Sequence, residues 1–288
     1  MSHSSTPSAP ARSVLVTGAT GGLGAAVTRR LAAEGWTVHA AVRTQAGARQ
    51  LAELPGDIRP VTLDVTDEAS VAAAAEQVGG PLDGLVNSAG LIVQGFWEQV
   101  PAVALRRQFD VNVLGLMAVT RAFLPALRAG GGRVVNIGAL SSLVALPFFG
   151  PIAASKAALA SMTDSLRIEL RHQGVKVALV EPGAMRTEIF ARAVASARAD
   201  GVAGGPEVER HYARAAAAAG ESVAATKLHP VDAAVGAVHH ALTARRPRTR
   251  YLVGPDARTV RVARRLPTAV RDRALLSALH VTPASFNP

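Results

Sequence analysis

The sequence contains no cysteine, and aromatic residues make up only 4% of its 288 positions. Without thiols the chain can form neither a disulfide nor a cysteine metal site, and it has no thiolate nucleophile. The eight histidines show no spacing that is typical of metal ligands, so we predict no metal centre. His239 and His240 fall in an alanine-rich helical stretch and are expected at the surface.

Long apolar stretches are also missing, since no run approaches the roughly 18 residues that cross a bilayer. Residues 1–12 are rich in Ser, Pro and Ala and contain no apolar segment of the signal-peptide type. Such a composition predicts a disordered N-terminal tail. We therefore expect a soluble, cytoplasmic protein with no membrane span.

Acidic residues are outnumbered by basic ones, 21 Asp and Glu against 31 Lys and Arg, which gives a formal net charge of +10. A charge of this size is one mark of nucleic-acid binding. The densest basic stretches, residues 245–250 and 258–265, lie beside few aromatic side chains that could stack on bases. We predict no nucleic-acid partner, because a solvated basic face and a positive field around an anionic cofactor account for the charge.

Residues 14–24, VLVTGATGGLG, combine a short β-prone run, a glycine-rich turn and the beginning of a helix. Gly18, Gly22 and Gly24 give this turn its backbone freedom. Main-chain N–H groups and the positive end of the helix then point toward a bound anion. The pattern predicts a phosphate cradle, and the alternative is a glycine-rich turn that holds no ligand.

The rest of the chain alternates strands and helices without internal repeats, which predicts an α/β protein with a Rossmann-type, doubly wound parallel sheet. We predict a single domain over residues 13–255, with an Ala- and Arg-rich helical lid at 190–228 over the substrate. Residues 256–288 are predicted to be a C-terminal helical tail with a loose end. The expected strands are residues 14–16, 37–42, 58–63, 84–87, 133–137, 175–180 and 250–254.

The residues that follow the second and third strands indicate which dinucleotide would bind. Arg43 is the first charge after the second strand, and a basic residue there, assisted by Thr20, favours a 2′-phosphate over a free ribose hydroxyl pair. NADP(H) is therefore favoured over NAD. Asp64 could accept a hydrogen bond from the adenine amino group while Val65 packs on the ring, or Asp64 could act only as a cap, as Asp67 does.

Small and polar residues follow the fourth strand and interrupt the next helix. Ala89 and Gly90 would let the main chain approach a ligand closely. The helical pattern over residues 100–128 contains Asn112 beside its apolar face, and a buried Asn must be hydrogen-bonded. Asn112 is interpreted either as a packing residue or as one that holds a water in the site.

These motifs, in this order, resemble the short-chain dehydrogenase/reductase family over residues 13–255, and Arg43 with the basic tail resembles its NADP-preferring retinol and hydroxysteroid dehydrogenase branch. The resemblance rests on Thr17-Gly18-x-x-x-Gly22-x-Gly24, Asp64-Val65, Asn87-x-Ala89-Gly90, Asn112, Val134-Val135-Asn136-Ile137, Lys156, Pro182-Gly183 and Thr187. Candidate cofactor-binding residues are Gly18, Thr20, Gly22, Leu23, Gly24, Arg43, Asp64, Val65, Asn87, Ala89, Gly90, Lys156, Pro182, Gly183 and Thr187.

The catalytic motif of the family is Tyr-x-x-x-Lys with a serine about 13 residues before the tyrosine. Here Ile152 stands four residues before Lys156, and Ala139 stands at the serine position. Two alternatives remain open for a replacement hydroxyl. A shifted loop could present Ser141 or Ser142, or Tyr212 could reach in from the lid.

Loss of both hydroxyls would remove a general acid worth typically 10² to 10⁴ in rate. Lys156 and Asn112 remain as candidate catalytic residues, and Ala139, Phe149 and Ile152 would line an apolar substrate pocket. Three functions are consistent with this pattern. The protein is an NADP(H)-dependent reductase of an iminium or otherwise activated small molecule, a non-redox enzyme such as a cyclase, dehydratase or isomerase, or a silent nucleotide-binding regulatory protein.

Two predicted helices, over residues 100–128 and 153–171, resemble those that the family uses for assembly. The resemblance therefore implies a homodimer or a homotetramer.

Overall fold

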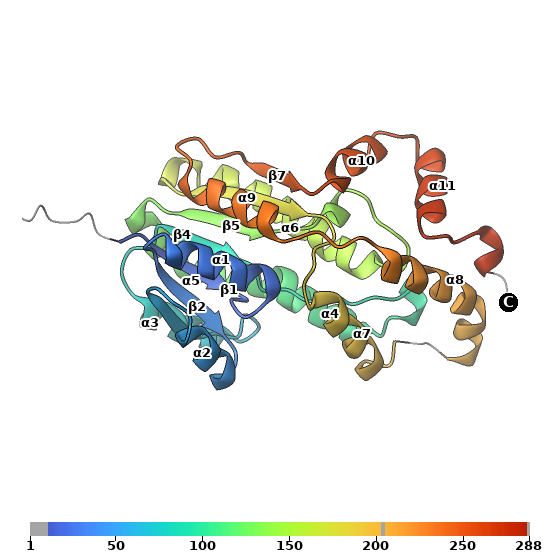
Figure 1. The fold of residues 1–288 in the computed structure, drawn as a ribbon, viewed down its shortest axis with the longest axis horizontal. Coiled ribbons are helices and arrows are strands. Elements are labelled where there is room, and N and C mark those ends of the chain that lie inside the picture. Colours follow the sequence, from blue (N-terminus) through green and yellow to red (C-terminus); the bar gives the residue numbers. More distant parts are fainter. Residues whose placement is uncertain (1–10, 203–204, 287–288) are drawn as a thin grey trace, which may run out of the picture.

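A computed structural model describes residues 11–202 and 205–286 of the chain. Seven parallel strands form one sheet in the order β3-β2-β1-β4-β5-β6-β7 (Figure 1). The order reverses beside β1, so the carboxyl ends of β1 and β4 face the crevice where doubly wound sheets bind their ligands. This confirms the predicted fold class. The predicted tail at residues 1–12 falls mostly outside the described residues.

The central strands β1, β4, β5 and β6 are short and mostly apolar runs that are covered on both faces, as parallel sheets require, whereas the edge strand β3 exposes Arg59 and Thr62. The predicted bounds are matched at residues 37–42, 84–87 and 133–137 and differ by one or two residues elsewhere. The strands are β1 Ser13–Thr17, β2 Thr37–Val42, β3 Ile58–Thr62, β4 Gly84–Asn87, β5 Arg133–Ile137, β6 Lys176–Pro182 and β7 Arg250–Val253.

Helices cover the two faces of the sheet and bury one apolar cluster on each. On one face α1 (Gly22–Ala33), α2 (Gln45–Ala52) and α9 (Asp232–Thr243) pack over side chains such as Val14 and Val16. On the other face α3 (Glu68–Val78), α5 (Leu116–Gly130) and α6 (Gly150–Glu169) pack over Leu15 and Leu85. The sequence did not lead us to expect α2, which has only eight residues and buries only Gly47 and Leu51.

The predicted helix over residues 100–128 is interrupted at its centre. It consists of α4 (Ala102–Phe109), the π-helical segment η2 (Asp110–Gly115) and α5. Gly115 allows a close approach there, because a Cβ at this position would lie 2.5 Å from the main-chain oxygen of Val65. The π-helical turn places Asn112 inward, where it is fully buried.

The segment Ala102–Gly130 is long and apolar enough to cross a membrane by length and composition alone. The sequence analysis considered uninterrupted apolar runs, whereas this criterion uses the mean hydropathy of a stretch of 18 residues, which reaches 1.3 here. In the structure Val119, Phe123 and Leu127 of this segment are fully buried against the sheet. It therefore serves as a core helix of the domain, and the cytoplasmic location stays a prediction.

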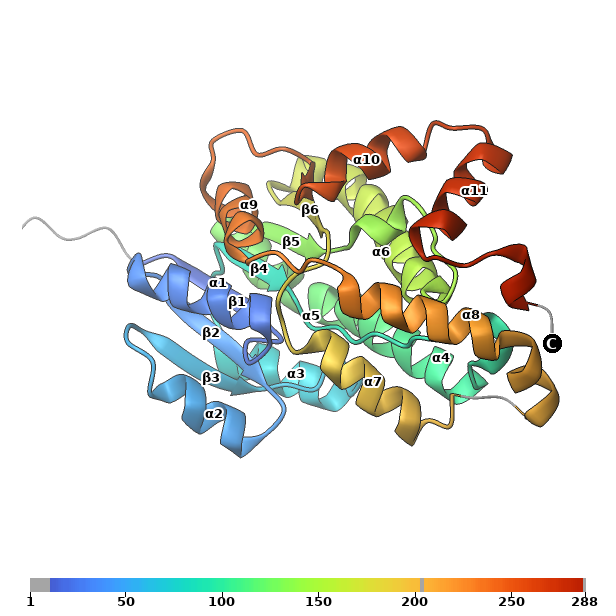
Figure 2. The same cartoon turned by 45° about the vertical axis from the view of Figure 1, so that its right-hand side comes forward.

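The predicted lid contains two helices, α7 (Ile189–Ala199) and α8 (Pro206–Ala225), which leave the sheet after β6 and return before α9 (Figure 2). The chain just before α7 and just after α8 is joined by an isolated β-bridge between Met185 and His229. At its far end Asp200 forms an ion pair with Arg107 of α4. We call residues 190–228 the lid segment, and its role as a lid over the substrate stays a prediction.

The chain ends in α10 (Asp256–Ala263), α11 (Thr268–Ala278) and the short helix η5 (Pro283–Phe286). The predicted loose end is wrong, because residues 279–286 pack against α8, as Figure 2 shows. Leu279 and Val281 are buried there, and Phe286 lies edge-on to Phe96, with ring centroids 5.7 Å apart. Three short 3-10 helices complete the fold: η1 Trp97–Gln99, η3 Leu140–Ser142 and η4 Arg171–Gln173.

Candidate functional site

The glycine-rich turn between β1 and α1 brings main chain against main chain. Gly18 has a φ of +64°, and a Cβ there would lie 2.9 Å from the main chain of Ala89 after β4. A Cβ on Gly24 would lie 2.2 Å from the oxygen of Gly18. Since no side chain caps the beginning of α1, its first N–H groups are left for an anion.

Leu23 contributes to this turn through its main chain. Its side chain is 5% exposed and packs in the core with Val27. Its predicted contact with a cofactor therefore reduces to its N–H group in the first turn of α1. The same turn faces Thr187, because a Cβ on Gly22 would lie 2.5 Å from the Thr187 methyl group.

A basic corner lies beside this turn, at the end of β2. Arg43 and Thr20 are both exposed there. A Cβ on Gly47 would lie 3.1 Å from the Thr20 methyl group, so the beginning of α2 packs on the glycine-rich turn. Thr44 caps α2 by accepting from the N–H of Gly47 at 3.1 Å. The corner offers one cation and a hydroxyl to a phosphate group.

Asp64 and Asp67 both act as local acceptors. Asp64 accepts from the N–H of Thr66 at 2.9 Å and from its hydroxyl at 2.7 Å. Burial raises the pKa of Asp64, but these bonds and the charge of Arg43 outweigh it and hold the pKa below its usual value. Asp67 caps α3 through the N–H of Ala69 at 3.0 Å, which confirms that prediction. Val65 lies in the core cluster, and its contact with adenine stays a prediction.

The side chain of Asn87 connects β4 to its neighbours through its nitrogen. The residue is fully buried, and its Nδ2 donates to Thr120 Oγ1 and to Asn136 Oδ1, both at 2.9 Å. Asn136 in turn donates to Thr163 Oγ1 at 2.9 Å. The side-chain nitrogen thus joins β4, α5 and β5, whereas the oxygen Oδ1 is buried without a hydrogen-bond partner among the described residues. The predicted contact of Asn87 with a cofactor stays a prediction.

Asn112 anchors the loop that follows β4. Its amide accepts from the N–H of Leu91 and donates to the oxygen of Leu91, both at 2.9 Å. A second donor contact reaches Ser155 Oγ at 3.3 Å. The sequence analysis missed Gln108, which is fully buried and donates to the same Ser155 hydroxyl at 3.0 Å. No local pattern distinguishes Gln108 from an exposed helical glutamine.

Lys156 lies on α6 directly after Ser155 and points to the end of β5. Its Nζ donates to the main-chain oxygen of Ile137 at 2.7 Å. A Cβ on Gly90 would lie 3.8 Å from this Nζ and 3.3 Å from Asn112 Oδ1, so three of the predicted residues meet here. Burial lowers the pKa of Lys156 to about 8.

Ile152 lies one helical turn before Lys156, on the same side of α6. It is 5% exposed, so a hydrocarbon side chain occupies that position. Ala139 follows β5 at the beginning of the loop that leads into η3 and is half-buried. Phe149 ends the same loop, with its ring 5.6 Å from that of Phe148. That these residues line an apolar substrate pocket stays a prediction.

Two of the three hydroxyls that could replace the missing ones, those of Ser142 and Tyr212, have other partners, and Ser141 stays a candidate. Ser142 donates to the fully buried carboxylate of Glu181 on β6, which also lies 3.1 Å from Arg250 Nε. Burial raises the pKa of Glu181 more than these two partners lower it. Tyr212 stacks on Phe96 at 4.8 Å, and burial and a hydrogen bond to Glu98 raise its pKa. Neither hydroxyl is hydrogen-bonded to Lys156.

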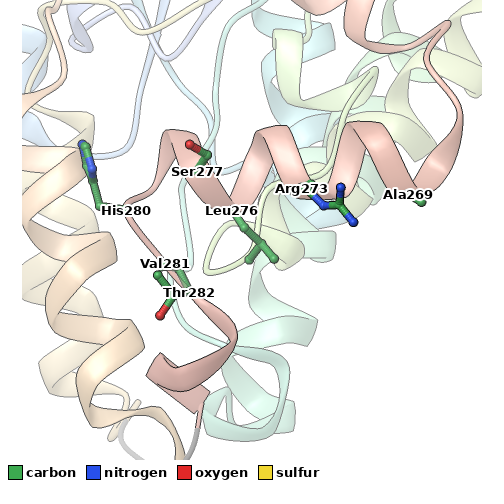
Figure 3. A pocket seen from close by; sticks show the side chains of 7 residues that line it. All are labelled: Ala269, Arg273, Leu276, Ser277, His280, Val281 and Thr282. Carbon is green, nitrogen blue, oxygen red and sulfur yellow. The ribbon is translucent and has the colours of Figure 1, made fainter.

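One cavity lies near the carboxyl ends of β6 and β7, and another lies near the end of the chain. One of about 350 Å³ includes Pro182 and Gly183, which the sequence analysis singled out. Gly183 is held by its N–H, which donates to the oxygen of Val253 at 2.9 Å. The other, of about 560 Å³, lies along α11 and contains none of the predicted residues. Its polar side chains Arg273, Ser277 and His280 point in different directions (Figure 3).

A family profile described as short chain dehydrogenase matches residues 12–198, which is more than half of the chain. The chain belongs to this family. It is 37% identical to human retinol dehydrogenase 16 over 262 residues, covering 85% of this chain and 81% of that protein. This similarity agrees with the resemblance to retinol dehydrogenases.

Two further comparisons cover most of the chain. An NADPH-dependent 3-dehydrocapnine reductase of Ornithobacterium rhinotracheale is 32% identical over 257 residues, covering 85% of this chain and 88% of that protein. A crystal structure of a short chain dehydrogenase from Burkholderia cenocepacia in complex with NADP has a TM-score of 0.71 and 30% identity, covering 95% of this chain and 98% of that one.

The pKa of Lys156 leads to a pH-dependent prediction. With a pKa of about 8, the ammonium group is charged below pH 8 and loses its proton above it. If the charged form holds an anionic dinucleotide, the Kd for NADPH is expected to be flat from pH 6 to 7 and to rise above pH 8 by up to about tenfold per pH unit. Fluorescence titration of NADPH measures this profile.

Two variants control this experiment. Lys156→Met should bind NADPH more weakly and with a flat profile, whereas Lys176→Met, which removes an exposed lysine of β6, should keep the wild-type profile. A wild-type Kd that stays constant from pH 7 to 9.5 would contradict the assignment.

Proposed function

We propose that this protein is an NADP(H)-dependent reductase of an apolar small molecule whose reacting carbon is already activated, as in an iminium ion. NADP(H) is the cofactor that suits the basic corner at Arg43. The NADP complex of the Burkholderia relative and the name of the Ornithobacterium reductase agree with this choice. The single observation that carries the proposal is Ile152, a buried hydrocarbon one turn before a buried lysine.

The residues present fit a dinucleotide. The glycine-rich turn is so close to Ala89 and Thr187 that side chains at Gly18 and Gly22 would collide with them, which keeps main-chain N–H groups open to phosphates. Arg43 and Thr20 would hold the 2′-phosphate, and Lys156 would hold the ribose next to the nicotinamide. When bound, the nicotinamide supplies hydride transfer to the substrate.

The rest of the site positions the substrate and excludes water. Ile152, Ala139 and Phe149 supply an apolar wall, and the lid segment covers it, so the reacting carbon would be held away from solvent. Reduction of a ketone also needs a proton at the oxygen, and Ile152, Ala139 and Phe149 carry no hydroxyl to deliver it. An iminium carbon needs no such proton, which is why we favour it over a ketone.

Stopped-flow absorbance at 340 nm tests the proposal. The NADPH-loaded protein is mixed with a cyclic iminium ion such as N-methyl-3,4-dihydroisoquinolinium, or with 1-tetralone, a ketone of the same ring size. We expect the iminium ion to be reduced faster than the ketone by about 10² to 10⁴, after subtraction of the rate without protein.

Three outcomes would contradict the proposal. Equal rates for the ketone would mean that a proton donor is present. Product without loss of NADPH would favour the non-redox enzyme. Absence of turnover across a panel of iminium ions and ketones, with NADPH still bound, would favour the regulatory protein.

We also propose that the protein forms homodimers or homotetramers through α4, η2 and α6. Three large apolar side chains are exposed on these elements, Val103 at 67%, Leu114 at 60% and Ile168 at 64%. A second copy would bury them, as homo-oligomer interfaces do. Sedimentation of the purified protein measures the assembly, and a monomer at micromolar concentration would contradict it.

A further inference from the structure

The loop that follows β4, residues 91–96, is tied to the elements around it. Its main chain is held from three sides, by bonds that join Leu91 to Asn112, Val93 to Gln108 and Gly95 to Phe148. Within this loop Gln94 is only 4% exposed, and its side-chain nitrogen Nε2 is buried without a hydrogen-bond partner among the described residues.

The neighbours of Gln94 place it beside the first turns of α6. On one side, Val93 is bound by Gln108, which also donates to Ser155, the residue before Lys156. On the other side, the N–H of Gly95 donates to the oxygen of Phe148 at 2.9 Å, next to the cap of α6. The main chain at Gln94 therefore runs along the part of α6 that carries Ile152.

The lid segment rests on the same loop. A Cβ on Gly95 would lie 2.7 Å from Val202 of the lid segment, and the ring of Phe96 stacks on Tyr212 of α8. Gln94 is therefore enclosed between the lid segment and α6. Buried polar groups are nearly always paired, because an unpaired one loses its bonds to water. A buried donor without an acceptor at this place indicates that the acceptor comes with a ligand.

We propose that Gln94 is a substrate-positioning residue whose side-chain N–H donates a hydrogen bond to an oxygen acceptor on the bound substrate. The substrate class is an apolar ring compound that carries a carbonyl or ether oxygen. An amide does not release a proton at neutral pH, so Gln94 orients the substrate and does not protonate it. In an otherwise apolar wall, one such donor sets which way the molecule lies. This inference rests on the proposed function.

Binding without turnover tests the proposal. The protein is loaded with NADP⁺, so that no reduction can occur, and is titrated by ligand-observed NMR with 1-tetralone and with tetralin, the same ring system without the oxygen. We expect the wild type to bind the ketone about tenfold more tightly, the value of one good hydrogen bond. Gln94→Leu should abolish this preference, and so should Gln94→Met, which keeps the length of the side chain but removes the donor.

Gln173→Leu, which changes an exposed glutamine in η4, is the matched control and should keep the wild-type ratio. The affinity for NADP⁺, measured in the same samples, should be unchanged in all variants and shows that they fold. An equal preference for 1-tetralone in the wild type and in Gln94→Leu would overturn the inference. If iminium ions are not reduced but the Gln94-dependent preference persists, the proposed reaction fails and this inference stands.

Discussion

Ketone reduction should rise by about 10² to 10⁴ when Ile152→Tyr is combined with Ala139→Ser, the range expected for a restored general acid. The tyrosine hydroxyl would stand one turn before Lys156, whose charge favours the phenolate form, and the serine would donate to the carbonyl oxygen. Initial rates of NADPH oxidation with 1-tetralone measure the gain.

The matched control is Ile152→Phe with Ala139→Ser, which adds the ring without its hydroxyl and should leave the ketone rate near that of the wild type. NADPH titration of both variants shows that the nucleotide site is intact. A Tyr/Ser variant that binds NADPH but does not gain over the Phe/Ser control would mean that Ile152 does not face the reacting carbon, or that the substrate class is wrong.

Arg43→Ala should weaken NADPH binding by roughly 10- to 150-fold and leave NADH binding nearly unchanged. The loss corresponds to about 1.5–3 kcal/mol for one hydrogen bond to a charged group. It is specific to NADPH because only that nucleotide carries the 2′-phosphate. Fluorescence titrations with both nucleotides at constant ionic strength give the ratio of the two Kd values.

Arg49→Ala serves as the control, since it removes an exposed arginine from the neighbouring α2. If the general positive field of the protein held the phosphate, both variants would show similar, small losses that disappear at high salt. Equal losses in Arg43→Ala and Arg49→Ala would therefore contradict the specific role of Arg43.

The sheet could be predicted from the sequence because its strands are short and separate, and its central strands are apolar on both faces. Residues 84–87 and 133–137 are bounded by polar or glycine residues, so pattern alone determines where they begin and end. The glycine-rich turn was predictable for a similar reason, since Gly18 and Gly24 each stand where a Cβ would collide with main chain.

The hydrogen bonds among the buried polar side chains of the site could not be predicted, because they join residues that are distant in the chain. Gln108 and Ser155 are 47 residues apart and meet only after α4 and α6 pack together. The π-helical turn at Asn112 leaves no mark on the apolar pattern. The chain end was misjudged because Phe286 finds its partners, Phe96 and Tyr212, on elements far away in sequence.

The hydrogen bonds of Asn87 could not be read from its motif. The motif places Asn87 among the cofactor residues, and the structure adds that its side-chain nitrogen bonds to Thr120 and Asn136 inside the sheet. The hydroxyls offered as replacements, Ser142 and Tyr212, are likewise paired with Glu181 and Glu98. Such pairings are decided by tertiary contacts that a single sequence does not display.

A crystal structure of the complex with NADP⁺ tests the central proposal most directly, because it identifies the side chain that faces the reactive carbon of the nicotinamide ring. The proposal predicts that the nucleotide binds along the glycine-rich turn and that the hydrocarbon side chain of Ile152 lies in van der Waals contact beside the substrate position. A hydroxyl of Ser141, Ser142 or Tyr212 directed at that carbon would contradict it.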